Sequence, residues 1–226
     1  MNVIHTPQRN QKDQVPYRYY LDKYRGLNPQ ETAQRCGLPY NAGNAAFSLR
    51  LMGRPYRVPF PAFTLVQEGA PPEKKPQPIQ ATEKVPPEYI LILRYLCEGR
   101  YTPPAGKPLS YNEVPWGGVY YRNFEGRCLK RLAYGFGADI GAFKALMEGT
   151  AEFRAELLPQ GDAGYRLEFI NGLFINLLLW GADDEFPPSA QILFDDNFIF
   201  AFTAEDLAVV GEVAITILKE RFKARK

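Results

Sequence analysis

Histidine and serine are scarce in this chain of 226 residues. It contains one histidine, His5, and three serines, Ser48, Ser110 and Ser189. Ser-His-Asp and Cys-His nucleophilic sites both depend on an imidazole. Such a site would therefore need His5, which lies close to the N-terminus, where chains commonly fray. A metal centre built from several histidines is excluded within one chain.

Cysteines are also few and widely spaced. Cys36, Cys97 and Cys128 lie 61 and 31 positions apart, and no CxxC pair occurs. This spacing argues against a zinc or iron–sulfur site held by these residues. An odd number of separated cysteines is typical of a reducing compartment, and the N-terminal segment has no apolar core of the secretory kind. We therefore expect a cytoplasmic protein.

The sequence has no long hydrophobic run. Its most apolar stretch, residues 169–182, has 14 residues and is interrupted by Asn171 and Asn176. A helix that spans a bilayer needs about 20 apolar residues. We therefore expect no interaction with a membrane.

Length and composition indicate one globular domain. Hydrophobic residues make up 46% and charged residues 23% of the chain, as is typical of globular domains, and a chain of this length can bury a large core without disulfides. We expect a flexible polar N-terminus over residues 1–15 and a single domain over residues 16–226. Six prolines mark residues 69–87 as an excursion from that domain rather than a strand.

Hydrophobic patterning predicts an α+β fold, in which a largely antiparallel sheet is packed with helices. Residues 163–170 and 173–180 flank Asn171-Gly172, the dipeptide most typical of a two-residue hairpin turn. The second of these strands is apolar on both faces, so we expect it to be central in the sheet. A second hairpin is expected over residues 47–59.

Capping residues mark the helices. Asn28 is a favourable N-cap and Gly37 a favourable C-terminal glycine for a short helix between them. Thr203 and Asp206 have the spacing of a capping box at the start of a C-terminal helix of about 20 residues. Helices are expected over residues 29–36, 86–98, 124–135, 139–149 and 203–222.

Charge is distributed unevenly along the chain. Residues 1–150 carry 20 basic and 12 acidic side chains, a net charge of +8, whereas residues 151–226 carry 7 basic and 13 acidic side chains, a net charge of −6. Such a division is typical either of an acidic surface that meets a ligand or of two faces that meet each other. Arg127 belongs to a basic and aromatic patch, but an ordinary solvated helix explains that patch better than nucleic-acid binding does.

An acidic loop carries the densest group of reactive side chains. Asp183, Asp184 and Glu185 precede two prolines, and Asp195 follows a predicted strand over residues 190–194. The two groups of carboxylates would lie roughly 17–20 Å apart along that strand, so one shared site is not implied. Carboxylates beside prolines often only order a turn. The alternatives are a surface for a ligand or partner, and a divalent-metal site that uses Asp183 and Glu185.

The same segment resembles a known family. The run from Trp180 through residues 183–188 to Gly211 is similar to the C-terminal signature of a bacterial and archaeal family catalogued as domain of unknown function 3786, and the likeness covers roughly residues 16–218. Members of that family are common in anaerobes, and some are fused to a four-cysteine iron–sulfur module like that of corrinoid iron–sulfur proteins, which this sequence lacks. The resemblance implies an anaerobic redox or one-carbon context and assigns no activity.

Two functions of different classes fit these features. The first is a non-catalytic binding or accessory module that uses the acidic loop with Trp180 and Phe186. Its partner would be an unidentified protein or small molecule, and the resemblance adds an iron–sulfur or corrinoid protein as a candidate. The second is a carboxylate-based enzyme with a divalent cation or with Glu185 as acid or base. The enzyme requires residues 183–185 to converge with Asp195 or Arg127 in one pocket. No cofactor is predicted, and no catalytic residue is assigned.

Overall fold

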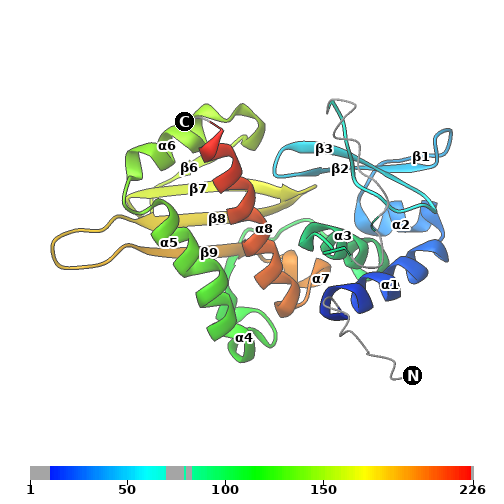
Figure 1. Ribbon diagram of the computed structural model, residues 1–226, viewed down its shortest axis with the longest axis horizontal. Coiled ribbons are helices and arrows are strands. Elements are labelled where there is room, and N and C mark those ends of the chain that lie inside the picture. The colour runs from blue at the N-terminus through cyan, green and yellow to red at the C-terminus, as the bar shows by residue number, and fades with distance from the viewer. Residues whose placement is uncertain (1–10, 70–78, 80–82, 225–226) are drawn as a thin grey trace, which may run out of the picture.

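The computed structural model describes residues 11–69, 79 and 83–224 of the chain (Figure 1). Its strands are β1 (Tyr40–Asn41), β2 (Ala46–Leu51), β3 (Arg54–Pro59), β4 (Val66–Gln67), β5 (Pro108–Ser110), β6 (Glu156–Leu158), β7 (Ala163–Ile170), β8 (Leu173–Trp180) and β9 (Ser189–Asp195). They form one sheet in the order β4-β3-β2-β7-β8-β9-β5, with β1 beside β2 and β6 beside β7. Every pairing among these strands is antiparallel. The predicted α+β fold is therefore confirmed.

Helices cover the sheet and account for most of the remaining described chain. They are α1 (Gln11–Arg25), α2 (Pro29–Cys36), α3 (Pro87–Glu98), α4 (Gly117–Phe124), α5 (Lys130–Phe136), α6 (Ile140–Gly149), α7 (Phe198–Ala201) and α8 (Ala204–Lys223). Short 3-10 turns stand at η2 (Tyr111–Glu113) and η4 (Ala151–Phe153). The predicted C-terminal helix is confirmed, since α8 has 20 residues. None of the helices in the described ranges combines the length and the apolarity that a bilayer crossing requires.

One helix boundary differs from the prediction. The helix expected to begin at Phe124 begins instead at Gly117, because a π-helical turn, η3 (Glu125–Leu129), joins α4 to α5 without a break. The residues before Phe124 include two glycines, which weaken a helical pattern when it is judged from the sequence. The other capping predictions agree with the structure. Asn28 accepts hydrogen bonds from two backbone N–H groups at 3.0 and 3.2 Å, and Gly37 has the left-handed φ of 63°.

Regular structure begins closer to the N-terminus than the sequence predicts. Helix α1 starts at Gln11, so residues 11–15 are helical, although the sequence predicts flexibility there. The physical reason is a tertiary contact. The buried Gln14 side chain donates a hydrogen bond to the Glu83 carbonyl at 2.6 Å. The expected flexibility of residues 1–10, and most of the proline-rich excursion, fall outside the described residues.

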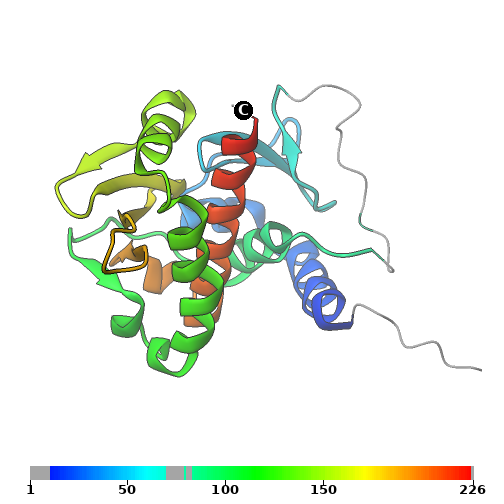
Figure 2. The same ribbon diagram turned by 60° about the vertical axis from the view of Figure 1, so that its left-hand side comes forward.

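The predicted hairpins form with their expected turns. Strands β7 and β8 have the predicted bounds, and β8 is an interior strand of the sheet, paired with β7 on one side and β9 on the other. Its residues Leu173, Ile175, Leu177 and Leu179 are fully buried, as expected of a central strand that is covered on this face. Helices α5 and α8 lie side by side over this part of the sheet (Figure 2).

Two groups of elements meet along a narrow junction of the sheet. Strands β1–β3 with α1–α3 lie on one side of Figure 1, and β6–β9 with α5, α6 and α8 lie on the other. The register between β2 and β7 consists of one pair, Leu51 with Ile170. The side chain of Asn171 reinforces it, because its oxygen accepts the Arg50 backbone N–H at 2.7 Å. The asparagine predicted as a turn residue thus also joins the two groups.

Gly53 tests how tightly this junction constrains the β2–β3 turn. Gly53 and Gly106 both have positive φ, 77° and 93°. A Cβ on Gly53 would lie 2.0 Å from the Glu152 carbonyl oxygen, whereas one on Gly106 would meet no atom within 4 Å. Gly53→Ala should lower the free energy of unfolding by about 3 kcal/mol, through strain and overpacking, and Gly106→Ala by about 1 kcal/mol, through backbone strain alone. Urea denaturation measures both values, and equal losses would contradict the constraint from Glu152.

Candidate functional site

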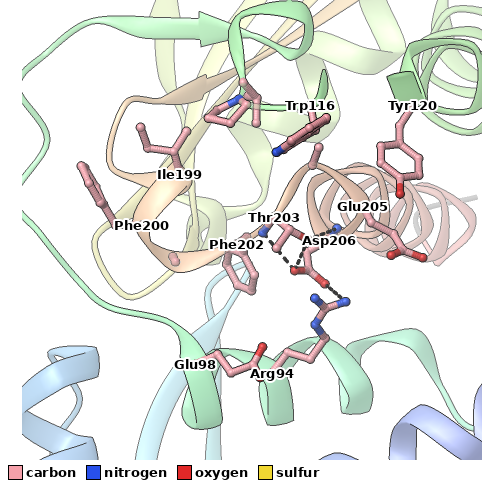
Figure 3. Close-up of a pocket in the computed structure, with 14 residues that line it drawn as sticks. Arg94, Glu98, Trp116, Tyr120, Ile199, Phe200, Phe202, Thr203, Glu205 and Asp206 are labelled. Atoms are coloured by element: carbon pink, nitrogen blue, oxygen red, sulfur yellow. Dashed lines mark hydrogen bonds and ion pairs between the residues drawn. The ribbon is translucent and has the colours of Figure 1, made fainter. Parts of the chain in front are cut away.

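A pocket of about 450 Å³ lies between α3, α4, α7 and the first turn of α8 (Figure 3). Its wall is built from segments that are far apart in the sequence. Helix α3 supplies Arg94 and Glu98, the loop after η2 and helix α4 supply Trp116 and Tyr120, and the remaining side comes from residues 199–206. The volume is within the range of pockets that hold small ligands, roughly 300–1,000 Å³.

The floor of the pocket is a buried ion pair. The Arg94 guanidinium Nη1 lies 2.7 Å from Asp206 Oδ1, and the two side chains are 21% and 6% exposed. The other oxygen of Asp206 accepts hydrogen bonds from Thr203, from its backbone N–H at 3.0 Å and from its hydroxyl at 2.7 Å. Burial raises the pKa of Asp206, while Arg94 and the Thr203 hydrogen bonds act in the opposite direction. The predicted capping box is therefore confirmed, with a third member from α3.

The guanidinium and the neighbouring carboxylate are held by helix α1. Arg94 lies over the Tyr20 ring, with 5.4 Å between the guanidinium carbon and the ring centroid. The Tyr20 hydroxyl donates to Glu98 at 3.1 Å, and Lys23 Nζ lies 2.7 Å from the other Glu98 oxygen. Although burial opposes them, the hydrogen bonds from Lys23 and Tyr20 lower the pKa of Glu98. This side of the pocket is thus a fixed arrangement of paired charges.

Exposed aromatic rings form the rim. Trp116 is 79% exposed, Phe200 55% and Tyr120 41%. Trp116 also has the left-handed φ of 67°, which is an outlier for a bulky residue and costs about 1–3 kcal/mol. The Trp116 side chain is mostly exposed, so its own burial does not offset the cost of this backbone conformation. The backbone holds the indole over the pocket instead (Figure 3).

The turn that carries Trp116 is tightly fixed. The Gly117 N–H donates to the Val114 carbonyl at 2.8 Å. A Cβ at position 117 would lie 1.8 Å from the Tyr111 carbonyl oxygen, so only glycine fits there. Tyr111 is itself stacked on Phe124, with 4.0 Å between the ring centroids. The turn that carries Trp116 is therefore packed directly against the hydrophobic core.

The acidic loop of the sequence analysis lies elsewhere. Residues 181–188 form the tip of the β8–β9 hairpin, which projects from the body of the molecule in Figure 1. The Asp183 carboxylate accepts the backbone N–H groups of Glu185 and Phe186 at 2.9 and 2.7 Å, which is the geometry of a turn-ordering aspartate. Asp184 and Glu185 are exposed, as is Phe186 at 64%. Trp180 is half-buried at the end of β8.

The other predicted site residues are not gathered at this loop. Asp195 ends β9, away from the hairpin tip, and its carboxylate lies 2.7 Å from the Arg166 guanidinium. Burial raises the pKa of Asp195, against the effect of Arg166. Arg127 forms an ion pair with Glu212 of α8. Among the described residues, neither Asp195 nor Arg127 forms a hydrogen bond or ion pair with residues 183–185, so the convergence that the enzyme hypothesis requires is absent there.

The described residues also offer no cluster for a metal. Within that part of the chain, no group of three or more histidine, cysteine, aspartate or glutamate side chains has a geometry suited to a metal ion. Within the described residues, the candidates Asp183 and Glu185 therefore do not belong to a cluster that could hold a metal ion.

The three cysteines are buried core residues. Burial raises the pKa of Cys36 to about 11 and that of Cys97 and Cys128 to about 12. Each thiol donates to a backbone carbonyl, and the Cys128 thiol reaches that of Ala208 at 3.2 Å. A thiol with such a pKa is protonated at neutral pH and is a poor nucleophile.

Sequence reasoning missed the pocket because its parts are dispersed. Arg94 is one polar residue in an apolar helix, and nothing near it in the sequence indicates a partner at Asp206. Trp116 did leave a signal. It lies between Pro115 and Gly117, and a bulky aromatic residue inside a turn has little core to pack against and is a candidate for recognition.

The ion pair on the floor can be tested by removing its carboxylate. Asp206→Ala leaves the Arg94 charge buried and removes the cap of α8, so the free energy of unfolding should fall by about 3–5 kcal/mol. Asp22→Ala is the matched control, because Asp22 and Arg25 form an exposed pair at 2.9 Å, and its effect should stay within about 0.5 kcal/mol. Denaturant titration measures both, and a similar small effect for the two variants would refute the structural role of Asp206.

Comparison with known proteins gives the chain a family. Neither the curated proteins nor the solved structures gave a significant match. A family model described as "Domain of unknown function (DUF3786)" matches residues 28–217. The match contains all the segments that line the pocket as well as the hairpin tip. Because it spans more than half of the sequence, the chain belongs to the DUF3786 family.

Proposed function

We propose that this protein is a binding module and that its ligand site is the pocket at the start of α8. One observation carries the proposal. Trp116 is kept in a strained backbone conformation with 79% of its surface exposed at the mouth of a cavity. Strain of this kind persists where the surrounding structure enforces it, and it is concentrated at ligand sites. The ligand site is thus the pocket and not the acidic loop expected from the sequence, while the expected class of function, a binding module, is the same.

The arrangement of charges favours binding over turnover. Asp206 is buried and already has Arg94 and Thr203 as partners. A general acid or base must instead reach the proton that it transfers on a substrate. Glu98 is occupied by Lys23 and Tyr20 in the same way. The polar groups of the floor therefore serve to shape the site, and the aromatic rim supplies the contact surface.

The setting of this module is proposed from the cysteines and from the family. Cys36, Cys97 and Cys128 are free and buried, which supports a reducing compartment such as the cytoplasm. The resemblance to a family common in anaerobes supports a role in anaerobic redox or one-carbon metabolism. An iron–sulfur or corrinoid protein is the macromolecular partner that this setting suggests.

Trp116 provides the decisive variant. Trp116→Ala removes an exposed side chain, so the free energy of unfolding should change by about 0.5 kcal/mol or less. It should abolish the rise in thermal midpoint that a small-molecule screen produces with the unmodified protein, because a ligand stabilises only the state that binds it. Tyr134→Ala is the control, since Tyr134 is an aromatic residue of α5 with 66% exposure and does not line the pocket. Compounds that still raise the thermal midpoint of the Trp116→Ala variant would show that the ligand binds elsewhere.

The tip of the β8–β9 hairpin is a second candidate surface, for a protein partner. It presents Asp184, Glu185 and the exposed ring of Phe186 on a projecting turn. The turn does not depend on the first two side chains, because Asp183 orders it. An aromatic ring beside exposed carboxylates fits a basic surface with an apolar depression.

Mutation distinguishes a binding role of Asp184 and Glu185 from a structural role in capping the turn. Asp184→Ala with Glu185→Ala should leave the thermal midpoint nearly unchanged and weaken partner capture in a pull-down from native lysate. Asp183→Ala, the control, should lower the free energy of unfolding by about 1 kcal/mol because it removes two hydrogen bonds to the backbone. Stability lost in the double variant would show that Asp184 or Glu185 is structural instead.

A further inference from the structure

We propose that the pocket at the start of α8 selects a small organic cation, an alkylammonium or guanidinium group carried on a compact frame. This inference rests on the proposed ligand site and adds the class of its ligand. Three features support it: the aromatic rim, the charge of the lining and the pairing of the only arginine in it.

The rim offers ring faces from separate elements. Trp116 and Tyr120 come from the η2–α4 region and Phe200 from α7, and they stand on different sides of the opening in Figure 3. A cation is attracted to the face of an aromatic ring within about 6 Å, most strongly to tryptophan. Trp116, the most exposed of these rings, therefore offers an alkylated cation the strongest contact of this kind at the opening.

The lining is acidic. Its charged side chains are one arginine and three carboxylates, Glu98, Glu205 and Asp206. Arg94 pairs with Asp206 and Lys23 pairs with Glu98, so the negative charge of Glu205 is the one left over. Glu205 is exposed in the first turn of α8, on the side of Tyr120, and Glu98 stands on the opposite side of the pocket (Figure 3). Because Lys23 and Tyr20 already bind Glu98, Glu205 is the lining carboxylate that a ligand would meet without an ion-pair partner among the described residues. This arrangement favours positive charge in the pocket.

The arginine does not reverse this preference. Its guanidinium is paired with Asp206 at 2.7 Å, and the Tyr20 ring lies against it. An anionic ligand would have to compete with a buried carboxylate for that charge, and displacing such a partner is strongly unfavourable. Arg94 therefore fixes the floor and does not serve as an anion receptor.

The start of α8 also does not favour an anion. A helix N-terminus carries partial positive charge, which attracts anions in the absence of other groups. Here Glu205 and Asp206 already occupy the first turn. Asp206 and Thr203 also satisfy each other's backbone N–H groups. The partial positive charge at the start of α8 is therefore already balanced by side chains of the protein itself.

Pocket size points to a small molecule as the source of the cation. A volume of about 450 Å³ accommodates a compact ligand. The same chemistry is present in a lysine or arginine side chain of a partner protein, so the test includes a capped amino acid beside the free cation.

The test uses the fluorescence of Trp116. The chain has two tryptophans, so Trp180→Phe makes Trp116 the only indole reporter in the full-length protein. The probes are choline, its neutral isostere 3,3-dimethylbutan-1-ol, the anion 3,3-dimethylbutanoate and N-acetyl-arginine amide. Choline should change the Trp116 emission in a saturable manner and bind about tenfold more tightly than the neutral isostere. The anion should not bind.

Two variants localise the effect by calorimetry. Glu205→Gln should weaken choline binding about threefold to tenfold by removing one charge, and Trp116→Leu about tenfold by removing the ring face. Asp22→Asn, at an exposed carboxylate of α1 that does not line the pocket, is the matched control and should have no effect. Tighter binding of the capped arginine than of choline would support the same cationic site and assign its ligand to a partner's side chain.

The possible failures are distinguishable. Equal or tighter binding of the neutral or anionic probe, still lost in Trp116→Leu, would overturn the cation and leave the ligand site standing. A Trp116 that responds to none of the four probes up to their solubility limits would count against both.

Discussion

Burial of the Asp206 carboxylate is the constraint on which the rest of the structure depends. With 6% of its side chain exposed, this group is stable in ionised form only if it is paired and hydrogen-bonded. Thr203 provides the local partner and begins α8, while Arg94 provides the distant partner and attaches α8 to α3. One carboxylate thus determines both where the longest described helix starts and how two remote segments meet.

That contact is one of several that join the two groups of elements, beside the ion pairs of Arg50 with Glu168 and of Arg54 with Glu220. The sheet is continuous from β4 to β5, yet β2 and β7 share a single residue pair. Asn171 adds a hydrogen bond across this junction, and Asn197 bridges the Thr102 and Gly172 carbonyls at 2.9 and 3.1 Å. A narrow strand junction transmits little rigidity by itself. Side-chain bonds from turns and helix ends therefore add to a shared hydrophobic core in holding the halves in one arrangement.

The pocket is a consequence of the same geometry. Its floor is the Arg94–Asp206 pair, and its rim is carried by the turn at Trp116, which the stacked Tyr111 and Phe124 fix to the core. The hairpin tip has the opposite character. Asp183 accepts hydrogen bonds from backbone N–H groups two and three residues away. Its carboxylate therefore stabilises a local turn, and those of Asp184 and Glu185 are exposed on that turn. The adjacent acidic residues 183–185 thus act only within their own turn. In contrast, Asp206 at the start of α8 pairs with Arg94 of α3, joins two distant elements and helps to form the candidate site.

The sequence by itself determined the features whose causes are local. The hairpin at Asn171-Gly172 follows from turn chemistry, the buried β8 from its uninterrupted apolar run, and the start of α8 from the spacing of Thr203 and Asp206. Only the tertiary structure decided which partner Asp206 has across the chain, that residues 11–15 join helix α1, and that Trp116 stands over a cavity. The reason is physical: caps and turns involve atoms a few residues apart, whereas an ion pair or a pocket depends on a fold that brings remote residues together.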